Sequence, residues 1–182
     1  ILQPINLNQL NIDVYVDAAF ACGWGSECGT NPESVKSRTG YIIEVAGCPV
    51  LWVSKLQSTI ATSTMESEYT ALSMALRAAI PLIAVTKAVA NGLAFTQDRI
   101  LTFKATVHED NQGAIILANL EPGRHTPRSK FYALRLHWFR SWLKPNEIEI
   151  IFISTKLQKA DYLTKPLQSM PFAINRKLSM GW

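Results

Sequence analysis

The stretch Asn11-Ile-Asp-Val-Tyr-Val-Asp17 decides how the rest of this chain is interpreted. Apolar Ile12, Val14 and Val16 alternate in it with polar residues, and this period of two predicts a β-strand with one face in a core. Asp17 stands where the strand ends and a glycine-rich segment begins. An aspartate in that position is a turn former or a ligand, and taken alone Asp17 is better explained as a turn former.

The composition is that of an ordinary globular chain. Its 182 residues, 48% of them hydrophobic and 18% charged, suffice for one domain with a full core. We therefore expect a single domain over 1–182, with 1–11 as a linker from a preceding segment and 167–182 as a C-terminal tail. The cysteines at 22, 28 and 48 form no CxxC motif and have no histidine nearby, so free thiols in a reducing compartment are expected.

Neither a membrane span nor a targeting segment is apparent. No apolar run approaches the roughly 20 residues that cross a bilayer, so no membrane partner is expected. The chain starts with Ile1, without an initiator methionine or a signal peptide. An intracellular protein cut from a longer polypeptide is therefore expected.

Positive charge is concentrated in the second half of the chain. Residues 1–100 carry 6 basic and 8 acidic groups, whereas residues 101–182 carry 12 basic and 6 acidic groups. Between Arg124 and Lys144, basic residues that include Arg140 are interleaved with aromatic residues and no acid is present. Such a run is usually the solvated face of an amphipathic helix, here predicted over 129–143, but it also suits a polyanion backbone.

The strand patterns predict a mixed sheet. Further strands are expected at 39–46, 50–54, 101–108 and 147–153. The first three strands read as an antiparallel meander with a turn at 47–49, and the last two arrive through helical crossovers and so lie parallel to strand one. The expected fold is α/β, a five-stranded mixed sheet with helices on both faces.

One long helix and several short helices are expected between the strands. Ser63 and Glu66 form a capping box, which predicts a helix that ends near Gly92 and is kinked or divided at Pro81. The shorter helices are expected over 114–119, 129–143 and 158–166.

Glu68 is the second candidate functional acid. At 100° per residue it shares a face of the long helix with Met65, Leu72, Ala75, Leu76, Ala79 and Ile83. Glu66 lies on another face and belongs to the cap. An ionised carboxylate on an apolar face is costly unless it is paired or bound to a metal. We therefore predict that Glu68, and not Glu66, is functional.

Asp110 and Asp161 complete the candidate set. Asp110 follows the strand at 101–108, and Asp161 falls with Leu157, Ala160 and Thr164 on the predicted inner side of the helix at 158–166. The ends of strands one and four lie at the same sheet edge, where sites usually form. Singly, each acid has a structural explanation: a turn for Asp17, a buried ion pair for Glu68, an N-cap for Asp110 and a helix-start acid for Asp161.

Only the joint placement of the four carboxylates argues for a metal site. Four like charges stay ionised at neutral pH only with cations among them. Oxygen ligands without histidine or cysteine suit Mg²⁺ or Mn²⁺ rather than zinc. Two such ions about 3.5–4 Å apart form a clamp for phosphodiester cleavage.

Six sequence motifs point to a family. In chain order they are Val16-Asp-Ala18, Ser37-Arg-Thr-Gly-Tyr41, Trp52-Val-Ser-Lys-Leu-Gln57, Ser63-Thr-Met-Glu-Ser-Glu-Tyr-Thr-Ala-Leu72, Asp110-Asn-Gln-Gly-Ala-Ile115 and Ala160-Asp-Tyr-Leu-Thr-Lys-Pro166. From Tyr15 to Trp182 the chain resembles the ribonuclease H domain of copia-type long-terminal-repeat retrotransposon polyproteins. The resemblance implies a ribonuclease H-like fold and makes Asp17, Glu68, Asp110 and Asp161 the metal ligands and catalytic residues.

The resemblance also implies an activity and partners. It implies an endonuclease that cuts the RNA strand of RNA/DNA hybrids with two Mg²⁺ ions, for which Mn²⁺ substitutes, and leaves 5′-phosphate and 3′-hydroxyl ends. Asp17 bridges both ions, Asp161 completes the site of the nucleophile-side ion, and Glu68 and Asp110 hold the leaving-group ion. The implied partners are the hybrid and the reverse transcriptase domain of the same polyprotein, and the implied location is a cytoplasmic virus-like particle.

The expected nucleic-acid contacts come from two sources. The resemblance places Thr64 and Gln112 near the scissile region of the hybrid, and the basic segment adds Arg124, Arg128 and Lys130. His125 in that segment is equally consistent with a phosphate contact and with a solvated loop, whereas His108 and His137 are not expected to be ligands.

The chain departs from the family in three places. Ala19 and Phe20 stand where a second acid and a tryptophan are frequent, Lys130-Phe-Tyr-Ala133 replaces a Lys-His-Ile-Asp word, and no histidine lies between Ile150 and Asp161. The alternatives are a non-catalytic RNA- or hybrid-binding module, and another two-metal nuclease or integrase of the same fold. Retention of all four acids favours the enzyme, because a pure binder gains nothing from negative charge beside phosphates.

Overall fold

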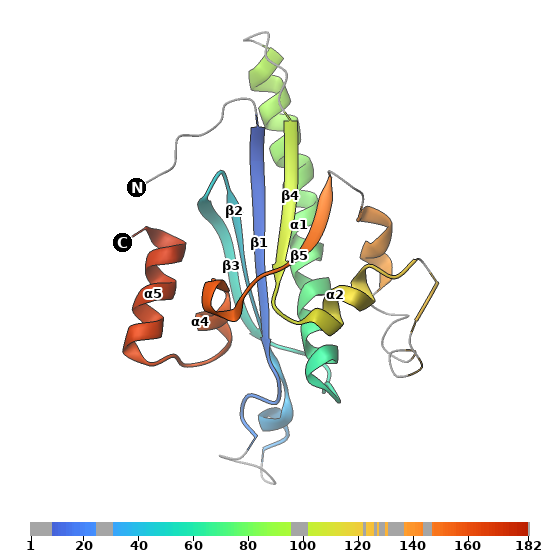
Figure 1. Ribbon diagram of the computed structural model, residues 1–182, viewed down its shortest axis with the longest axis vertical. Helices are drawn as coiled ribbons and strands as arrows, with labels where there is room; N and C mark the ends of the chain where they lie inside the picture. Colours follow the sequence, from blue (N-terminus) through green and yellow to red (C-terminus); the bar gives the residue numbers. More distant parts are fainter. Residues whose placement is uncertain are drawn as a thin grey trace.

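The computed structural model describes residues 9–24, 31–95, 102–121, 123–125, 127, 130, 137–143 and 147–181. Its centre is one sheet in the strand order β3-β2-β1-β4-β5 (Figure 1). The strands are β1 (Gln9–Ala19), β2 (Arg38–Val45), β3 (Cys48–Leu56), β4 (Thr102–Glu109) and β5 (Ile148–Phe152). Pairing is antiparallel between β1 and β2 and between β2 and β3, and parallel between β1 and β4 and between β4 and β5. The predicted five-stranded mixed sheet is confirmed, and β1 begins inside the expected linker.

Helices lie on both faces of the sheet, as expected (Figure 1). They are α1 (Thr64–Phe95), α2 (Gln112–Ala118), α4 (Asp161–Thr164) and α5 (Ser169–Met180), with short 3₁₀ segments η1 (Pro32–Val35), η2 (His137–Trp142) and η3 (Thr155–Leu157). The long helix α1 runs behind the sheet, whereas α4 and α5 lie in front of it on the side of β1, β2 and β3.

The core lies between α1 and the sheet. Ile12, Val14 and Val16 of β1 are at most 1% exposed, and Leu72 and Leu76 of α1 are fully buried. Each such side chain contributes about 1.5–3 kcal/mol by leaving water. The period of two in β1 and the apolar stripe of α1 therefore fix which faces meet.

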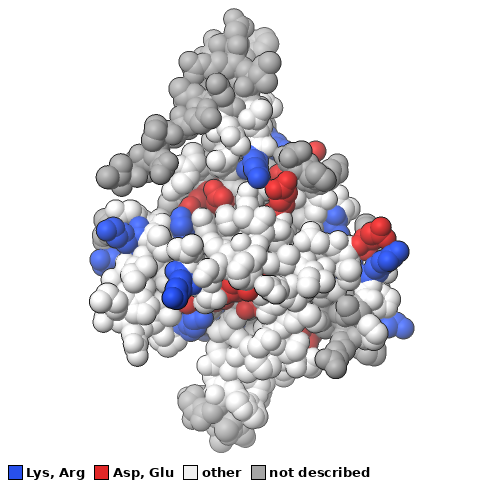
Figure 2. Space-filling view, viewed as in Figure 1, with Lys and Arg blue, Asp and Glu red and all other residues white. Residues whose placement is uncertain are grey.

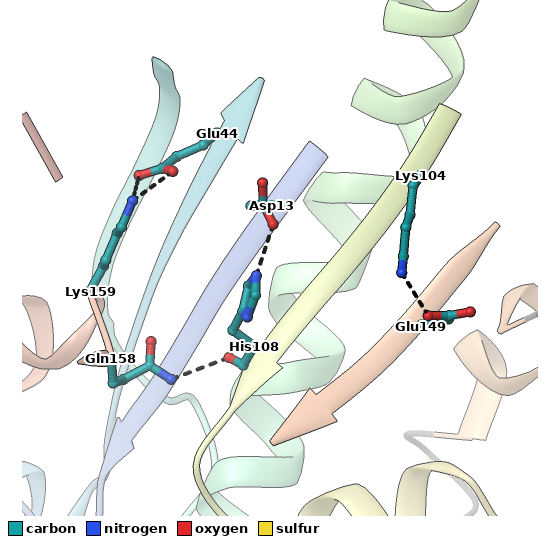
Figure 3. A network of polar contacts seen from close by, with 7 residues as sticks. All are labelled: Asp13, Glu44, Lys104, His108, Glu149, Gln158 and Lys159. Carbon is teal, nitrogen blue, oxygen red and sulfur yellow. Dashed lines mark hydrogen bonds and ion pairs between the residues drawn. The ribbon is translucent and has the colours of Figure 1, made fainter. Parts of the chain in front are cut away.

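The opposite face of the sheet is polar. There Asp13 pairs with His108 at 2.9 Å, and Lys104 pairs with Glu149 at 3.3 Å (Figure 3). The ring of His108 also stacks on Tyr15, with centroids 4.4 Å apart. The side chain of His108 thus contacts Asp13 and Tyr15 on the sheet surface.

The cap of helix α1 differs from its prediction. The Ser63 hydroxyl accepts from the amide of Glu66 as expected, but the Glu66 carboxylate accepts from the amide and hydroxyl of Thr62 rather than from Ser63. Pro81 lies inside the helix without dividing it. By length and composition residues 64–92 would suffice to cross a membrane, a property that a long core helix shares.

Three other segments refine the sequence-based expectations. The hairpin turn is made by Ala46 and Gly47, both at positive φ, so β3 starts earlier than predicted. Residues 169–180 of the expected tail form the regular helix α5. Most of the helix predicted over 129–143 falls outside the described residues, and its last part is the 3₁₀ segment η2.

Candidate metal centre

Three of the four predicted ligands meet at one edge of the sheet. Carboxylate oxygens of Asp17, Glu68 and Asp110 lie within 4.8 Å of one another. They come from the end of β1, the second turn of α1 and the residue after β4. Asp17 is 3% exposed and Glu68 is 8% exposed. The turn-former explanation of Asp17 is therefore wrong, since its side chain faces two other acids.

Asp110 reaches this edge because another residue caps the next helix. The Asn111 side chain accepts from the amide of Ala114 at 3.0 Å and is the N-cap of α2. The N-cap explanation of Asp110 is therefore wrong. Its carboxylate instead accepts from the Thr155 hydroxyl at 2.8 Å, and this bond ties the strand end to η3.

Glu68 has no ion-pair partner among the described residues, so the buried-pair explanation is not supported there. It accepts a backbone hydrogen bond from Ala18, and its Oε2 atom is buried without a hydrogen-bond partner in the described part of the chain. A buried carboxylate oxygen left unpaired is costly, so the arrangement is suited to receive a cation.

Asp161 lies beside the three-carboxylate set but is not part of it. Its carboxylate forms an ion pair with Lys165 at 2.5 Å, one helical turn later. On the same helix, the Thr164 hydroxyl donates to Asp17. Asp161 and Thr164 are buried as predicted, whereas Leu157, expected on the same inner side, is 54% exposed.

Gly40 determines how close α4 comes to Asp17. It pairs with Asp17 across β1 and β2. A Cβ atom at Gly40 would lie 2.7 Å from Thr164 and 2.8 Å from Leu163. Only a glycine leaves room for α4 here, and this explains why the motif Ser37-Arg-Thr-Gly-Tyr41 contains Gly40.

Gln158 is a positioning residue that the sequence did not reveal. Its buried amide nitrogen donates to the carbonyl of Val16 in β1 at 2.8 Å. It also donates to the carbonyl of His108 in β4 at 3.2 Å (Figure 3). Next to it, Lys159 pairs with Glu44 at 2.8 Å. These contacts join the segment before α4 to three strands and thereby place Asp161 near Asp17.

Glu109 is a further acid that sequence reasoning missed. It is fully buried, and its carboxylate accepts from the amide of Asn111 at 3.0 Å. The alternation of β4 could have revealed that Glu109 faces inward, because it follows the buried Ala105 and Val107 in the period of two. Its negative charge acts on Glu68.

Burial and mutual repulsion change how these acids ionise. Burial is the main cause that raises the pKa of Asp17 to about 6; Asp161 and Asp110 add to it, while Thr164 and Lys165 oppose it. For Glu68, burial followed by the charges of Glu109, Asp17 and Asp110 raises the pKa to about 10. Full ionisation of this cluster at neutral pH therefore requires added positive charge.

The donor set fits a hard divalent cation. It consists of carboxylate oxygens, and no histidine or cysteine belongs to the group within the described residues. Mg²⁺ and Mn²⁺ take such ligands, while zinc favours nitrogen and sulfur. The arrangement can hold a cation against a phosphate oxygen and can accept protons from a bound water.

The structure gives a mixed result for the expected nucleic-acid contacts. Thr64 and Gln112 are exposed and are the first residues of α1 and α2. In the sequence, Thr64 shortly precedes Glu68 and Gln112 shortly follows Asp110. Arg124 is exposed and pairs with Glu121 at 2.9 Å. Lys130 is exposed, and Arg128 lies outside the described residues.

Arg140 does not belong to a polyanion-binding face. It is 5% exposed and donates to the backbone carbonyl oxygens of Arg124 and Leu117. Phe139 of the same segment is fully buried in the core. On the face that Figure 2 shows, basic and acidic side chains are interspersed.

The chain is similar to two plant transposon polyproteins. It is 32% identical over 144 residues to the retrovirus-related Pol polyprotein from transposon TNT 1-94 of Nicotiana tabacum, an alignment that covers 79% of this chain and 10% of the polyprotein. With the corresponding polyprotein from transposon RE2 of Arabidopsis thaliana the identity is 28% over 177 residues, covering 95% and 11%. The chain thus spans about a tenth of the length of these curated relatives.

A solved structure supports the fold assignment. The N-terminal RNase H domain of rv2228c from Mycobacterium tuberculosis, determined as a fusion with maltose-binding protein, matches with a TM-score of 0.54 at 13% identity. The match covers 90% of this chain and 97% of that chain. No protein-family model matches the chain. The chain is therefore similar in sequence to part of the retrovirus-related Pol polyproteins of plant transposons, and it has the ribonuclease H-like fold that the resemblance of its motifs implied.

Proposed function

We propose that the chain is a divalent-metal-dependent endonuclease that hydrolyses the RNA strand of RNA/DNA hybrids during reverse transcription of a transposon. The observation that carries this proposal is the meeting of Asp17, Glu68 and Asp110 within 4.8 Å. It occurs at the end of parallel strands in a ribonuclease H-like fold, and the relatives are Pol polyproteins of transposons.

The four acids have separate roles in the proposed reaction. Asp17 would hold the divalent ions together with the other acids, and Asp161, which lies near it, would serve the side of the attacking water. Glu68 and Asp110 would hold the ion on the leaving-group side. Two divalent ions supply an activated water and stabilise the departing oxygen. The water oxygen bonds to the RNA phosphorus, the bond to the 3′ oxygen breaks, and that oxygen takes up a proton.

The products of this reaction are a 5′-phosphate and a 3′-hydroxyl end. Mg²⁺ is the proposed ion, with Mn²⁺ as a substitute, because the ligands are all carboxylates. The 2′-hydroxyl distinguishes the RNA strand from the DNA strand. Thr64 and Gln112, which begin α1 and α2, are the proposed contacts to the hybrid, together with Arg124, Arg128 and Lys130.

The decisive experiment compares substrates and one variant. Labelled RNA/DNA hybrid, double-stranded RNA and double-stranded DNA are incubated with the chain and Mg²⁺. We expect cleavage only of the RNA strand of the hybrid, and a loss of at least about 10³-fold in Asp17→Asn because the central ligand is removed. Asp13→Asn is the matched control, since Asp13 lies on the same strand but pairs with His108. Equal activity of Asp17→Asn and the unchanged chain would refute the assignment.

A calorimetric Mn²⁺ titration distinguishes the enzyme from a binding module. Two-site binding that is lost in Asp17→Asn supports the enzyme. Hybrid binding without any Mn²⁺ binding supports the non-catalytic alternative. Circular dichroism of Asp17→Asn and Asp13→Asn verifies that both variants retain the fold.

A further inference from the structure

Helix α5 exposes a stripe of apolar side chains to solvent and buries two polar side chains against the protein. Met170, Ile174 and Leu178, which recur every four residues, are 72%, 49% and 38% exposed. Two polar residues of the same helix, Asn175 and Ser179, are instead buried. An amphipathic helix that covers its own domain has the reverse arrangement.

The buried polar atoms of α5 are not compensated. Asn175 Oδ1 and Ser179 Oγ are buried without a hydrogen-bond partner among the described residues. Within the described part of the chain, the Asn175 amide nitrogen donates only to the carbonyl of Pro171 in the same helix, at 3.3 Å. The apolar stripe of α5 therefore faces outward, and its burial does not determine the position of this helix.

The strand that α5 contacts extends the exposed apolar surface. Val50 and Trp52 of β3 are 47% and 58% exposed. Met180, at the end of α5, is 48% exposed. We call the surface formed by Met170, Ile174, Leu178, Met180, Val50 and Trp52 the α5 patch. In Figure 2 the area over α5 is mostly uncharged and is bordered by basic side chains.

The occupant of the α5 patch must be apolar with an acidic rim. Residues 169–180 contain Arg176 and Lys177 and no acid, so acidic groups around an apolar centre would complement the patch. Bases and phosphates do not match a stripe of methionine, isoleucine and leucine. A protein surface does, because interface cores favour apolar side chains and methionine.

We propose that the α5 patch is the docking surface for another segment of the same Pol polyprotein. The curated relatives are about ten times longer than the aligned region, so a partner held in the same polypeptide is available at high effective concentration. The inference rests on the proposed place of the chain in a Pol polyprotein and is independent of the acidic cluster.

Two methionines of the patch serve as probes of docking. Met170 and Met180 are exposed, whereas Met65 and Met74 of α1 are partly buried and serve as internal references. The chain alone and the longer Pol polyprotein that contains it are treated briefly with peroxide, and oxidation is read by mass spectrometry. We expect Met170 and Met180 to oxidise about tenfold more slowly in the polyprotein.

Variants make the test specific to this surface. Ile174→Asp combined with Leu178→Asp should abolish the protection of Met170 in the polyprotein. Val85→Asp combined with Val89→Asp is the matched control, since these valines of α1 are 59% and 57% exposed and lie on another helix. The control variant should keep the protection.

Three results would overturn the proposal. The first is equal oxidation of Met170 and Met180 in the chain and in the polyprotein. The second is protection of these methionines that increases with protein concentration and accompanies a doubled mass, because a second copy would then cover the patch. The third is protection of the methionines by vesicles of anionic lipid. Hybrid cleavage and Mn²⁺ binding by the chain alone are unaffected in the α5 variants, so failure of this proposal is distinguishable from failure of the proposed enzyme.

Discussion

Lys165 places a positive charge beside the acidic cluster. Its ammonium pairs with Asp161 at 2.5 Å, and the charges of Asp17 and Asp110 also act on it. Burial works to lower the pKa of Lys165, but the bond to Asp161 and the three acidic charges outweigh it and raise the pKa. Lys165 thus supplies part of the positive charge that the cluster requires.

Removing this charge should weaken the metal-free protein. We expect Lys165→Met to lower the free energy of unfolding in EDTA at pH 7 by up to about 1 kcal/mol, a modest value because its side chain is 43% exposed. The contribution is fully present at pH 7, which lies below the unfolded pKa of 10.5. Urea denaturation with EDTA or MgCl₂ measures it, and Mg²⁺ should restore most of the loss.

Lys156→Met is the control for this prediction. Lys156 belongs to η3, is exposed, and forms no ion pair among the described residues. An equal loss in the two variants, or a loss in Lys165→Met that Mg²⁺ does not reduce, would contradict the role assigned to Lys165.

At the scale of elements, the contact between β2 and α4 sets the geometry of the site. Gly40 admits α4, Gln158 anchors the segment before it, and Asp161 and Thr164 then approach Asp17. The four residues of α4 are too few to be stable as an isolated helix. Its position therefore depends on these contacts with the sheet.

Gly40→Ala should displace α4. The added Cβ would lie 2.7 Å from Thr164, so we expect a loss of about 1–3 kcal/mol in stability. Mn²⁺ affinity should fall as well, because Asp161 moves away from Asp17. Calorimetry and urea denaturation measure the two effects.

Gly92→Ala is the matched control, since a Cβ atom there meets nothing within 4 Å. It should leave Mn²⁺ binding unchanged and keep or increase stability by up to about 1 kcal/mol. Unaltered Mn²⁺ affinity in a folded Gly40→Ala variant would show that the position of α4 does not govern the site.

For the whole molecule, the acidic cluster trades stability for the capacity to bind a cation. Folding brings Asp17, Glu68 and Asp110 together and buries Glu109 behind them. The cost of gathering these carboxylates is met by the core between α1 and the sheet. A bound divalent ion would return part of that cost, so stability and metal binding should be linked.

This linkage has a definite sign. Folding raises the pKa of Asp17 from 3.8 to about 6, so the native state binds the proton more tightly than the unfolded state. The stabilisation is fully present below pH 3.8 and is lost as the pH rises through 6. In EDTA, the stability of the chain relative to Asp17→Asn should therefore fall by on the order of 2 kcal/mol between pH 4 and pH 7.

Denaturation curves across this pH range, with and without Mg²⁺, measure the linkage. Mg²⁺ should stabilise the chain at pH 7.5 and have little effect at pH 4.5, because protons displace it from the carboxylates. The Asp17→Asn variant should show a smaller effect of Mg²⁺ at both pH values. A constant difference between the chain and the variant across the range would contradict the raised pKa of Asp17.

The sheet and the inward position of its acids could be predicted from the sequence. Alternation in β1 and β4 and the apolar stripe of α1 are local periodic signals, and a period fixes which face a side chain occupies. That is why Glu68 could be preferred over Glu66 and why the parallel strand ends were expected to bring Asp17 and Asp110 together. The family motifs agreed with this placement.

The pairing of polar and charged groups could not be predicted from the sequence. In the structure Asp161 forms an ion pair with Lys165, Arg140 donates to backbone carbonyl oxygens, and Asn111 caps α2. The structure also turned the apolar side of α5 outward, in a segment expected to be a weakly patterned tail. Such pairings depend on distances between residues far apart in the chain, and packing of the whole molecule sets these distances.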